Sequence, residues 1–167
     1  RLKEKKLGTT TVADFTYDTA PGKSIGQLAS VTGNNNISYS YQYDNLGRVY
    51  KETENIQGET FTTETSYNNY SQPQQIKYPG NTVYTVENNY QNGYISTVKG
   101  THQTTADIFT ATAYNPRGQI TSYSLGNGLS TARGYDDYGF PATIQTPGIQ
   151  DLAYEFNPLT GNLNWRK

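Results

Sequence analysis

The segment Tyr43-Asp44-Asn45-Leu46-Gly47-Arg48-Val49 decides how this chain folds. An Asp that follows a strand can accept a hydrogen bond from the backbone two residues further on, as in an Asx-turn. Gly47 supplies the positive φ angle that lets the chain reverse. Upstream, apolar residues alternate with polar ones at Ile37, Tyr39, Tyr41 and Tyr43, and a period of two indicates a strand. The segment therefore predicts a β-hairpin.

The same order of an aromatic residue, Asp or Asn, and Gly recurs along the chain. The copies lie at 114–120, 135–141, 156–163, 67–73 and 90–95, with an expanded copy that begins at Tyr17-Asp18. Ser71 replaces Gly in one copy, and another is one residue short. About seven units thus follow one another at a spacing of about 21–26 residues, a period typical of stacked repeats.

The residues that define these repeats are predicted to be structural. They are Tyr17, Asp18, Tyr43, Asp44, Gly47, Arg48, Tyr67, Tyr90, Gly93, Tyr114, Asn115, Gly118, Tyr135, Asp136, Gly139, Phe156, Asn157 and Gly161. A second set of turn residues closes each unit, among them Gln57-Gly58, Pro79-Gly80-Asn81, Gly126-Asn127-Gly128 and Pro147-Gly148. We therefore expect an all-β fold of consecutive antiparallel hairpins, with about fourteen strands in one curved sheet.

Composition removes several classes of protein. The chain of 167 residues is only 33% hydrophobic, holds 16 Tyr and no Cys, and has a formal net charge of −1. The absence of Cys excludes disulfides and thiol catalysis. Balanced charge argues against nucleic-acid binding, and no apolar stretch is long enough for a bilayer, so neither nucleic acid nor membrane insertion is expected.

The repeated Tyr-Asp-x-x-Gly-Arg-Val pattern resembles the YD repeat of the Rhs (rearrangement hotspot) family. This family includes bacterial polymorphic toxins, the cocoon-forming subunits of Tc insecticidal toxin complexes, wall-associated bacterial proteins and teneurins. The pattern covers nearly all of residues 1–167, which we interpret as a single array segment that starts and ends within a repeat. Departures from the family pattern are Asn68, Asn115, Asn157 and Gln91 in place of Asp, and Arg48 is the one Arg that follows the Gly.

The resemblance implies an arc of a β-shell with a structural role. By this interpretation the chain comes from a secreted or cell-surface protein, bacterial by its family, and helps to enclose or present a C-terminal effector. Its partners would be the rest of the shell and that effector. Unpaired strand edges also predict self-association.

Catalysis has little support in the sequence. His102 is the single His and lies in a polar run typical of a surface turn. Carboxylates occur in pairs at Glu52 and Glu54 and at Asp136 and Asp137, but Asp136 is already assigned to a repeat turn and no cleft is indicated. Calcium loops need more acidic residues than the second pair offers. The prediction is a chain that is not an enzyme, with no catalytic, cofactor or metal site.

The abundance of Tyr leaves a second function open. Aromatic rings beside amides are typical of surfaces that bind glycans or proteins, so a recognition or adhesion module is the alternative. Recurrence at the repeat period favours instead a ladder of aromatic residues within the sheet. Tyr70, Tyr94 and Tyr138, which lie between repeats, are the candidates for a contact surface. Both alternating faces hold Tyr and Thr, so the sequence does not assign an inner face.

Overall fold

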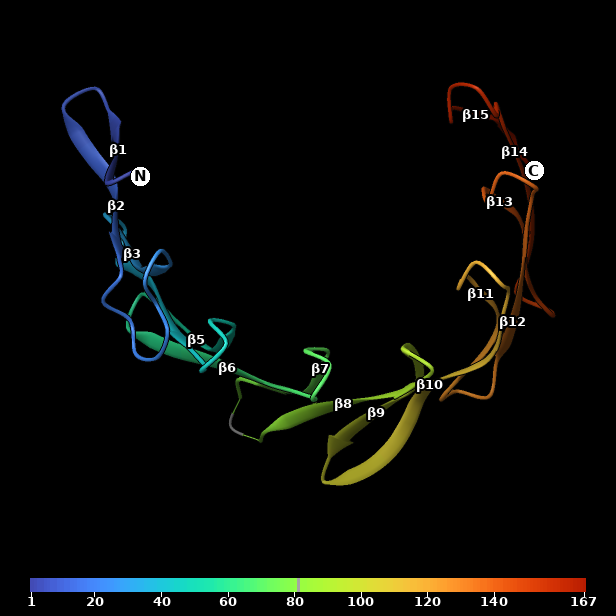
Figure 1. The fold of residues 1–167 in the computed structure, drawn as a ribbon, viewed down its shortest axis with the longest axis horizontal. Coiled ribbons are helices and arrows are strands. Elements are labelled where there is room, and N and C mark those ends of the chain that lie inside the picture. The colour runs from blue at the N-terminus through green and yellow to red at the C-terminus, as the bar shows by residue number, and fades with distance from the viewer. Residues whose placement is uncertain (81) are drawn as a thin grey trace. The chain divides into compact units, whose positions relative to one another are not determined.

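In the computed structural model of the chain, which describes residues 1–80 and 82–167, every regular element is a β-strand. The described residues form two compact units, Arg1–Val86 and Glu87–Lys167 (Figure 1). Asn81, the last residue of one predicted closing turn, lies outside the described residues. No α-helix of a length and apolarity suited to crossing a membrane occurs in the described part of the chain.

The first unit is built from consecutive hairpins. Its strands are β1 (Glu4–Leu7), β2 (Thr10–Tyr17), β3 (Leu28–Gly33), β4 (Ile37–Tyr43), β5 (Val49–Ile56), β6 (Glu59–Tyr67) and β7 (Pro73–Tyr78). β8 (Tyr84–Gln91) begins in this unit and ends in the second. Each strand from β1 to β6 pairs antiparallel with the next one along the chain.

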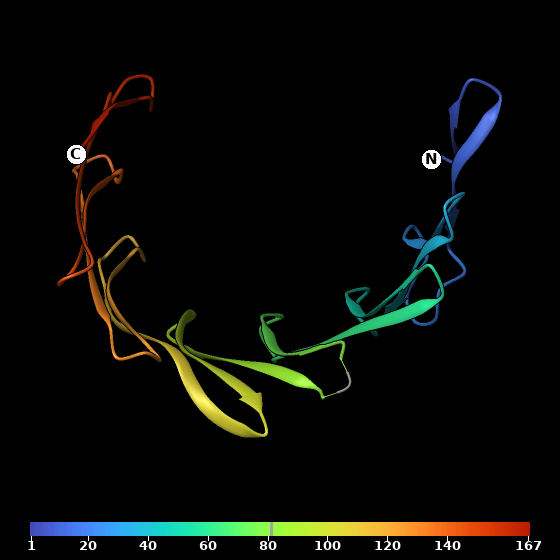
Figure 2. The same ribbon diagram turned by 180° about the vertical axis from the view of Figure 1, so that it is seen from behind.

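The second unit repeats this arrangement. Its strands are β9 (Tyr94–His102), β10 (Thr104–Tyr114), β11 (Ile120–Leu125), β12 (Ser130–Tyr135), β13 (Pro141–Thr146), β14 (Gln150–Phe156) and β15 (Leu163–Arg166). They too pair antiparallel in chain order. Seen from front and back, each unit taken by itself is an open, bent sheet (Figures 1 and 2). The predicted all-β fold of consecutive antiparallel hairpins in a curved sheet is confirmed.

The strand register gives each unit two different faces. In the first unit, one row across β2 to β6 consists of hydroxyl side chains: Thr16, Ser30, Ser40, Thr53 and Thr62. The row on the opposite face is mostly apolar: Phe15, Val31, Tyr39, Glu54 and Phe61. Period-two alternation in every strand, kept in register, produces this division.

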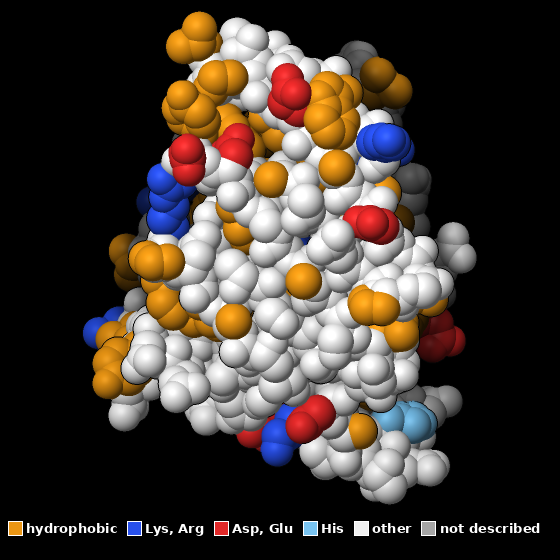
Figure 3. Space-filling view, turned by 90° about the vertical axis from the view of Figure 1, so that its right-hand side faces the viewer, with side chains coloured by type: hydrophobic (Ala, Val, Ile, Leu, Met, Phe, Trp, Pro, Cys, Tyr) orange, Lys and Arg blue, Asp and Glu red, His pale blue; other side chains and the backbone are white. Residues whose placement is uncertain are grey.

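The second unit has the same division. Its hydroxyl face carries the row Thr97, Thr110, Ser124 and Ser130 across β9 to β12. Its apolar face, a name used below for the side that carries Phe109, Tyr123, Arg133, Ile144 and Leu152, lies opposite. Figure 3 shows one side of the molecule, where white atoms of the backbone and of uncharged polar side chains and glycines dominate and orange hydrophobic side chains form small groups.

Burial is shallow throughout the described residues. Only Ala29 and Tyr43, each 6% exposed, form a buried hydrophobic core, while Ser24, Thr131 and Thr146 are buried polar residues. The accessible surface is 11230 Å², whereas a compact protein of this mass exposes about 8,200 Å². Stability must therefore come mainly from contacts within the sheet and at its turns.

Candidate functional site

The turn between β4 and β5 shows how a repeat reverses direction. Asp44 Oδ1 accepts hydrogen bonds from the backbone N–H groups of Leu46, at 2.8 Å, and Arg48, at 3.0 Å. The Asp44 N–H donates to the Arg48 carbonyl at 2.9 Å, and the φ angle of Gly47 is 75°. One side-chain oxygen and one glycine thus replace the ladder hydrogen bonds that the reversal interrupts.

The same bonding recurs at other repeat turns. The side-chain oxygen of the Asp or Asn accepts from the backbone two and four residues on at Asn68, Asn115 and Asp136. Asn157, in the longer copy, accepts from Leu159 and Thr160 N–H groups. In the expanded copy, Asp18 accepts from the Gly26 N–H and forms an ion pair with Arg1 at 2.6 Å. Turn chemistry is therefore shared although turn length varies.

The turn of the copy at 90–95 differs. Asn92 and Gly93 adopt φ angles of 52° and 84° between β8 and β9. Positive φ at both central residues is the geometry of a tight hairpin turn. Tyr90 and Gln91 are the last two residues of β8, so the missing residue is accommodated by shortening the turn.

Tyrosine hydroxyls connect several repeats to the one before. The hydroxyl of Tyr43 donates to the Leu28 carbonyl at 2.6 Å, and that of Tyr67 donates to the Val49 carbonyl at 2.7 Å. Further along the chain, Tyr114 donates to Ile95, and Tyr135 donates to Ile120 at 2.9 Å. Every acceptor is the second residue after the turn glycine of the preceding repeat. We refer to these bonds as hydroxyl locks.

The residue after the turn glycine makes a second contact between repeats. The guanidinium of Arg48 lies 4.3 Å from the ring centroid of Tyr67 in the next repeat. The rings of Tyr94 and Tyr114 stack with centroids 5.0 Å apart. Phe140 and Phe156 stack at 5.2 Å, although Phe156 has no hydroxyl to form a lock. Planar groups at this position therefore cover the aromatic residue of the following repeat.

Gly118 is constrained by its neighbour as well as by its backbone. Its φ angle is +77°, which side chains rarely tolerate. A Cβ atom at this position would lie 2.5 Å from the ring of Tyr94, the stacking residue of the preceding repeat. Gly148, in a closing turn, has a φ angle of +74° but nothing within 4 Å of such a Cβ. Of these two turns, the repeat turn is the one packed against another repeat.

Side-chain pairs across the turns differ in charge. The Nε of Arg48 donates to Asp44 Oδ2 at 2.7 Å. Asn68 instead donates to Gln72 at 3.0 Å, and Asn115 donates to Gln119 at 2.8 Å. Burial opposes ionisation of Asp44, but the hydrogen bonds from Arg48 and Leu46 outweigh it and hold the pKa of Asp44 below its usual value. At these three turns the acidic residue is thus paired with Arg, and the two amides are paired with Gln.

The three Tyr residues predicted as a contact surface lie in different environments. Tyr70 and Tyr138 are at turn tips, 85% and 68% exposed. Tyr94 is 45% exposed, because its ring stacks on Tyr114. Their contact role stays a prediction, and Tyr94 has a packing role besides.

The residues considered for chemistry do not converge. His102 is exposed at the end of β9. Glu52 and Glu54 lie on β5, opposite Tyr41 and Tyr39 of β4. Within residues 1–80 and 82–167, no group of three His, Cys, Asp or Glu side chains is placed to hold a metal ion.

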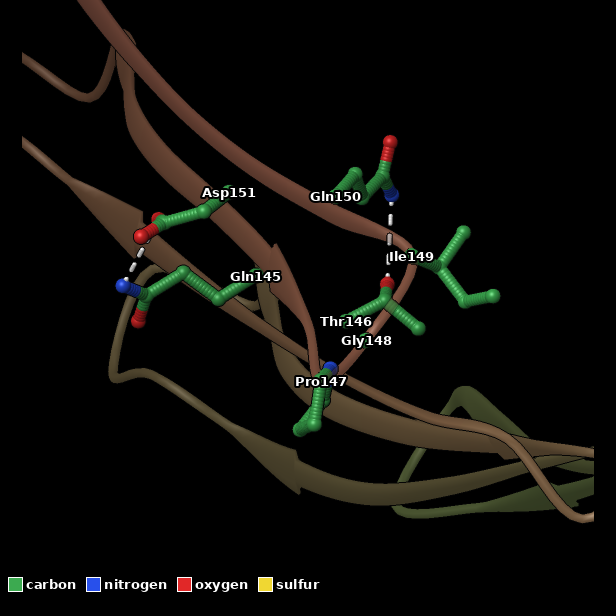
Figure 4. A pocket seen from close by; sticks show the side chains of 7 residues that line it. All are labelled: Gln145, Thr146, Pro147, Gly148, Ile149, Gln150 and Asp151. Atoms are coloured by element: carbon green, nitrogen blue, oxygen red, sulfur yellow. Dashed lines mark hydrogen bonds between the residues drawn. The ribbon is translucent and has the colours of Figure 1, made fainter.

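A hollow of about 560 Å³ lies at the closing turn between β13 and β14 (Figure 4). Gln145 donates to Asp151 at 3.0 Å, and Gln150 donates to Thr146 at 3.2 Å, as the dashed lines show. The hydroxyl of Thr146 also bonds that of Thr131 at 2.8 Å. These polar side chains form hydrogen bonds with one another. We therefore assign them to stabilising the turn rather than to binding a ligand in the hollow.

The fold and the turn edge, by which we mean the sheet edge that carries the turns after Tyr43, Tyr67, Tyr114 and Tyr135, together define a β-hairpin repeat protein. Hydroxyl locks and ring contacts join neighbouring repeats within each unit. No protein-family model and no curated protein matches the sequence. Solved structures do share the fold. The chain superimposes on TcdB2-TccC3-Cdc42 with a TM-score of 0.73 and 15% identity, and on TcdB2-TccC3 with 0.72 and 15%. TcdB2-TccC3 without its hypervariable C-terminal region gives 0.71 and 17%.

Each superposition covers 92% of this chain and 9% of the other. The chain therefore corresponds in fold to a small part of those molecules, which are Tc toxin complexes. The resemblance to the YD-repeat family that the sequence predicts is confirmed at the level of the fold.

Proposed function

We propose that residues 1–167 are one segment of a YD-repeat array and form part of a β-shell that encloses or presents a C-terminal effector. The segment would be structural and contribute no catalysis. The repeat-defining residues named above would act as its internal fasteners. Its partners would be the rest of the shell and the effector, and the whole protein would be secreted or exposed on a bacterial cell surface.

The hydroxyl locks carry this proposal. Each lock joins one repeat to the next through a backbone carbonyl within a unit, which is a contact that a repeat array can continue by adding further repeats. Shallow burial supports a wall, because a wall has two broad surfaces and little interior. The fold shared with Tc toxin complexes is in keeping with this role.

Limited proteolysis of the intact parent protein tests the proposal. A C-terminal effector enclosed by the array should resist cleavage, and Gly118→Val, which forces Tyr94 away from the repeat turn, should make it sensitive. Gly148→Val, at an unobstructed glycine, is the matched control and should preserve most of the protection. Equal cleavage of the effector in all three proteins would argue against enclosure.

A recognition module is the second candidate, and the exposure of Tyr70 and Tyr138 at turn tips favours it. Glycan titration followed by the fluorescence of Trp165 and Tyr would show saturable binding in that case. Tyr70→Ala and Tyr138→Ala should then weaken the response. A wall without recognition function gives no saturable signal.

A further inference from the structure

Arg133 lies in the middle of the apolar face of the second unit. In the sheet register, Arg133 of β12 is opposite Ile144 of β13, which is opposite Leu152 of β14. On its other side, the guanidinium carbon lies 5.2 Å from the ring centroid of Tyr123. Tyr123 in turn contacts the ring of Phe109 at 5.3 Å. A cation is thus surrounded by aromatic and aliphatic side chains.

The guanidinium of Arg133 has few polar partners. One terminal nitrogen donates to the Tyr123 hydroxyl at 3.4 Å, which is a long hydrogen bond. The Nε is buried and has no hydrogen-bond partner in the described residues. One terminal nitrogen of Arg48 is unpaired in the same way, but Arg48 also forms an ion pair with Asp44. Nor does any carboxylate in residues 1–80 and 82–167 form an ion pair with Arg133. A half-buried cation with an unmet donor is unfavourable unless something outside the chain compensates it.

We propose that the apolar face of the second unit binds an acidic polypeptide segment whose carboxylate pairs with Arg133. A guanidinium binds a carboxylate through two parallel N–H donors, and Nε is one of the donors available for this geometry. Apolar side chains of the segment would pack on Ile144, Leu152 and Phe109. Rows of side chains across several strands form a broad surface, which suits a polypeptide better than a small molecule.

The partner should be acidic, because this face carries a positive charge that no carboxylate of the described residues neutralises. A neutral apolar segment would cover the cation and leave it unpaired, which costs free energy, whereas an acidic one supplies the missing charge. The inference rests on the surroundings of Arg133 and holds whether or not the chain belongs to a shell. If the proposed shell exists, the segment would be part of whatever it encloses or contacts.

The test uses the 167-residue chain and a matched pair of short fluorescent peptides. Both peptides alternate Val and Thr, and they differ only in one central Glu or Gln. Fluorescence anisotropy should show that the Glu peptide binds about tenfold or more tightly than the Gln peptide, as expected for a hydrogen-bonded charge pair. Arg133→Met should remove this preference, and Lys77→Met, at an exposed cation of the first unit, should retain it.

Several outcomes would overturn the proposal. Equal affinity of the two peptides, or no binding of either, excludes a carboxylate partner on this face. Binding of the Glu peptide that 10 mM inorganic phosphate abolishes indicates a site for small anions. A melting midpoint lowered by Arg133→Met would mean that the chain itself compensates the guanidinium. Arg133→Lys, which retains the charge and lacks Nε, should fold like the parent chain and bind the Glu peptide more weakly.

Discussion

Arg48 and Arg133 each lie over a Tyr ring, but only Arg48 has its charge neutralised by a carboxylate of the described residues. Arg48, at a repeat turn of the first unit, lies over Tyr67 and forms an ion pair with Asp44 at 2.6 Å. Arg133, on the apolar face of the second unit, lies over Tyr123 with no acidic partner in the described residues. Stacking on a Tyr ring alone therefore does not identify a structural arginine. A structural arginine has its charge met within the chain.

Gly118→Val should have the largest effect on stability, because it disrupts the packing of a repeat turn against the preceding repeat. Backbone strain at positive φ and collision with Tyr94 should together lower the free energy of unfolding by about 3 kcal/mol or more. Gly148→Val keeps the strain and lacks the collision, so about 1–2 kcal/mol is expected. Urea denaturation of the two variants measures the difference. Equal losses would show that Tyr94 is free to move aside.

Replacing each arginine by Met compares how much each side chain contributes to the stability of the fold. Arg48→Met removes a ring contact and leaves Asp44 without its cation, so a loss of about 1–2 kcal/mol is expected. Arg133→Met removes a charge that no carboxylate of the described residues pairs with, and should leave stability unchanged or raise it. Thermal unfolding by circular dichroism checks both. The contrast fails if the two variants lose the same stability.

Tyr67→Phe isolates one hydroxyl lock. The Val49 carbonyl loses its donor while the ring contact with Arg48 remains, so about 1 kcal/mol should be lost. Tyr70→Phe removes a hydroxyl from a ring that is 85% exposed and should be neutral. Denaturant midpoints for the pair would decide whether the lock contributes. A neutral Tyr67→Phe would assign the coupling to ring contacts alone.

The smallest expected effect is on the pH dependence of stability. The pKa of Asp44 is depressed in the folded chain, so its contribution is present above the unfolded pKa, about 3.9, and is lost as pH falls through the folded pKa. The double variant Asp44→Asn, Arg48→Gln copies the amide pair of Asn115 and Gln119. Melting midpoints between pH 7 and 3 should then fall less steeply than in the parent chain. An unchanged slope would place the acid sensitivity elsewhere.

Much of the fold could be predicted because its determinants are local. The side-chain oxygen of Asp44 and the positive φ of Gly47 act within five residues, so the turn is readable from one repeat. Alternation of apolar and polar residues similarly predicts the strands. Sequence pattern also places Tyr43 on the strand side of the turn, although the acceptor of its hydroxyl is not visible there.

The rest of the turn edge depends on how one repeat sits against the next. The acceptor of the Tyr43 hydroxyl is Leu28, fifteen residues earlier, and only the register across β3 and β4 brings them together. The sequence predicts Tyr94 as a contact residue but does not reveal that its ring also stacks on Tyr114. The sequence does contain a signal for this stacking, because the residues directly after three turn glycines, Arg48, Tyr94 and Phe140, all have planar side-chain groups. The apolar surroundings of Arg133 likewise depend on the strand register, which places Ile144 opposite it.

The hydroxyl locks also have a direction, and direction matters while the chain is being synthesised. The donor always belongs to the later repeat and the acceptor to the earlier one. Translation delivers the earlier repeat first, so its carbonyl after the turn stays bonded to water until the next tyrosine leaves the ribosome. Each hairpin that donates a lock therefore satisfies a carbonyl of the hairpin before it, and the newest repeat still lacks that bond.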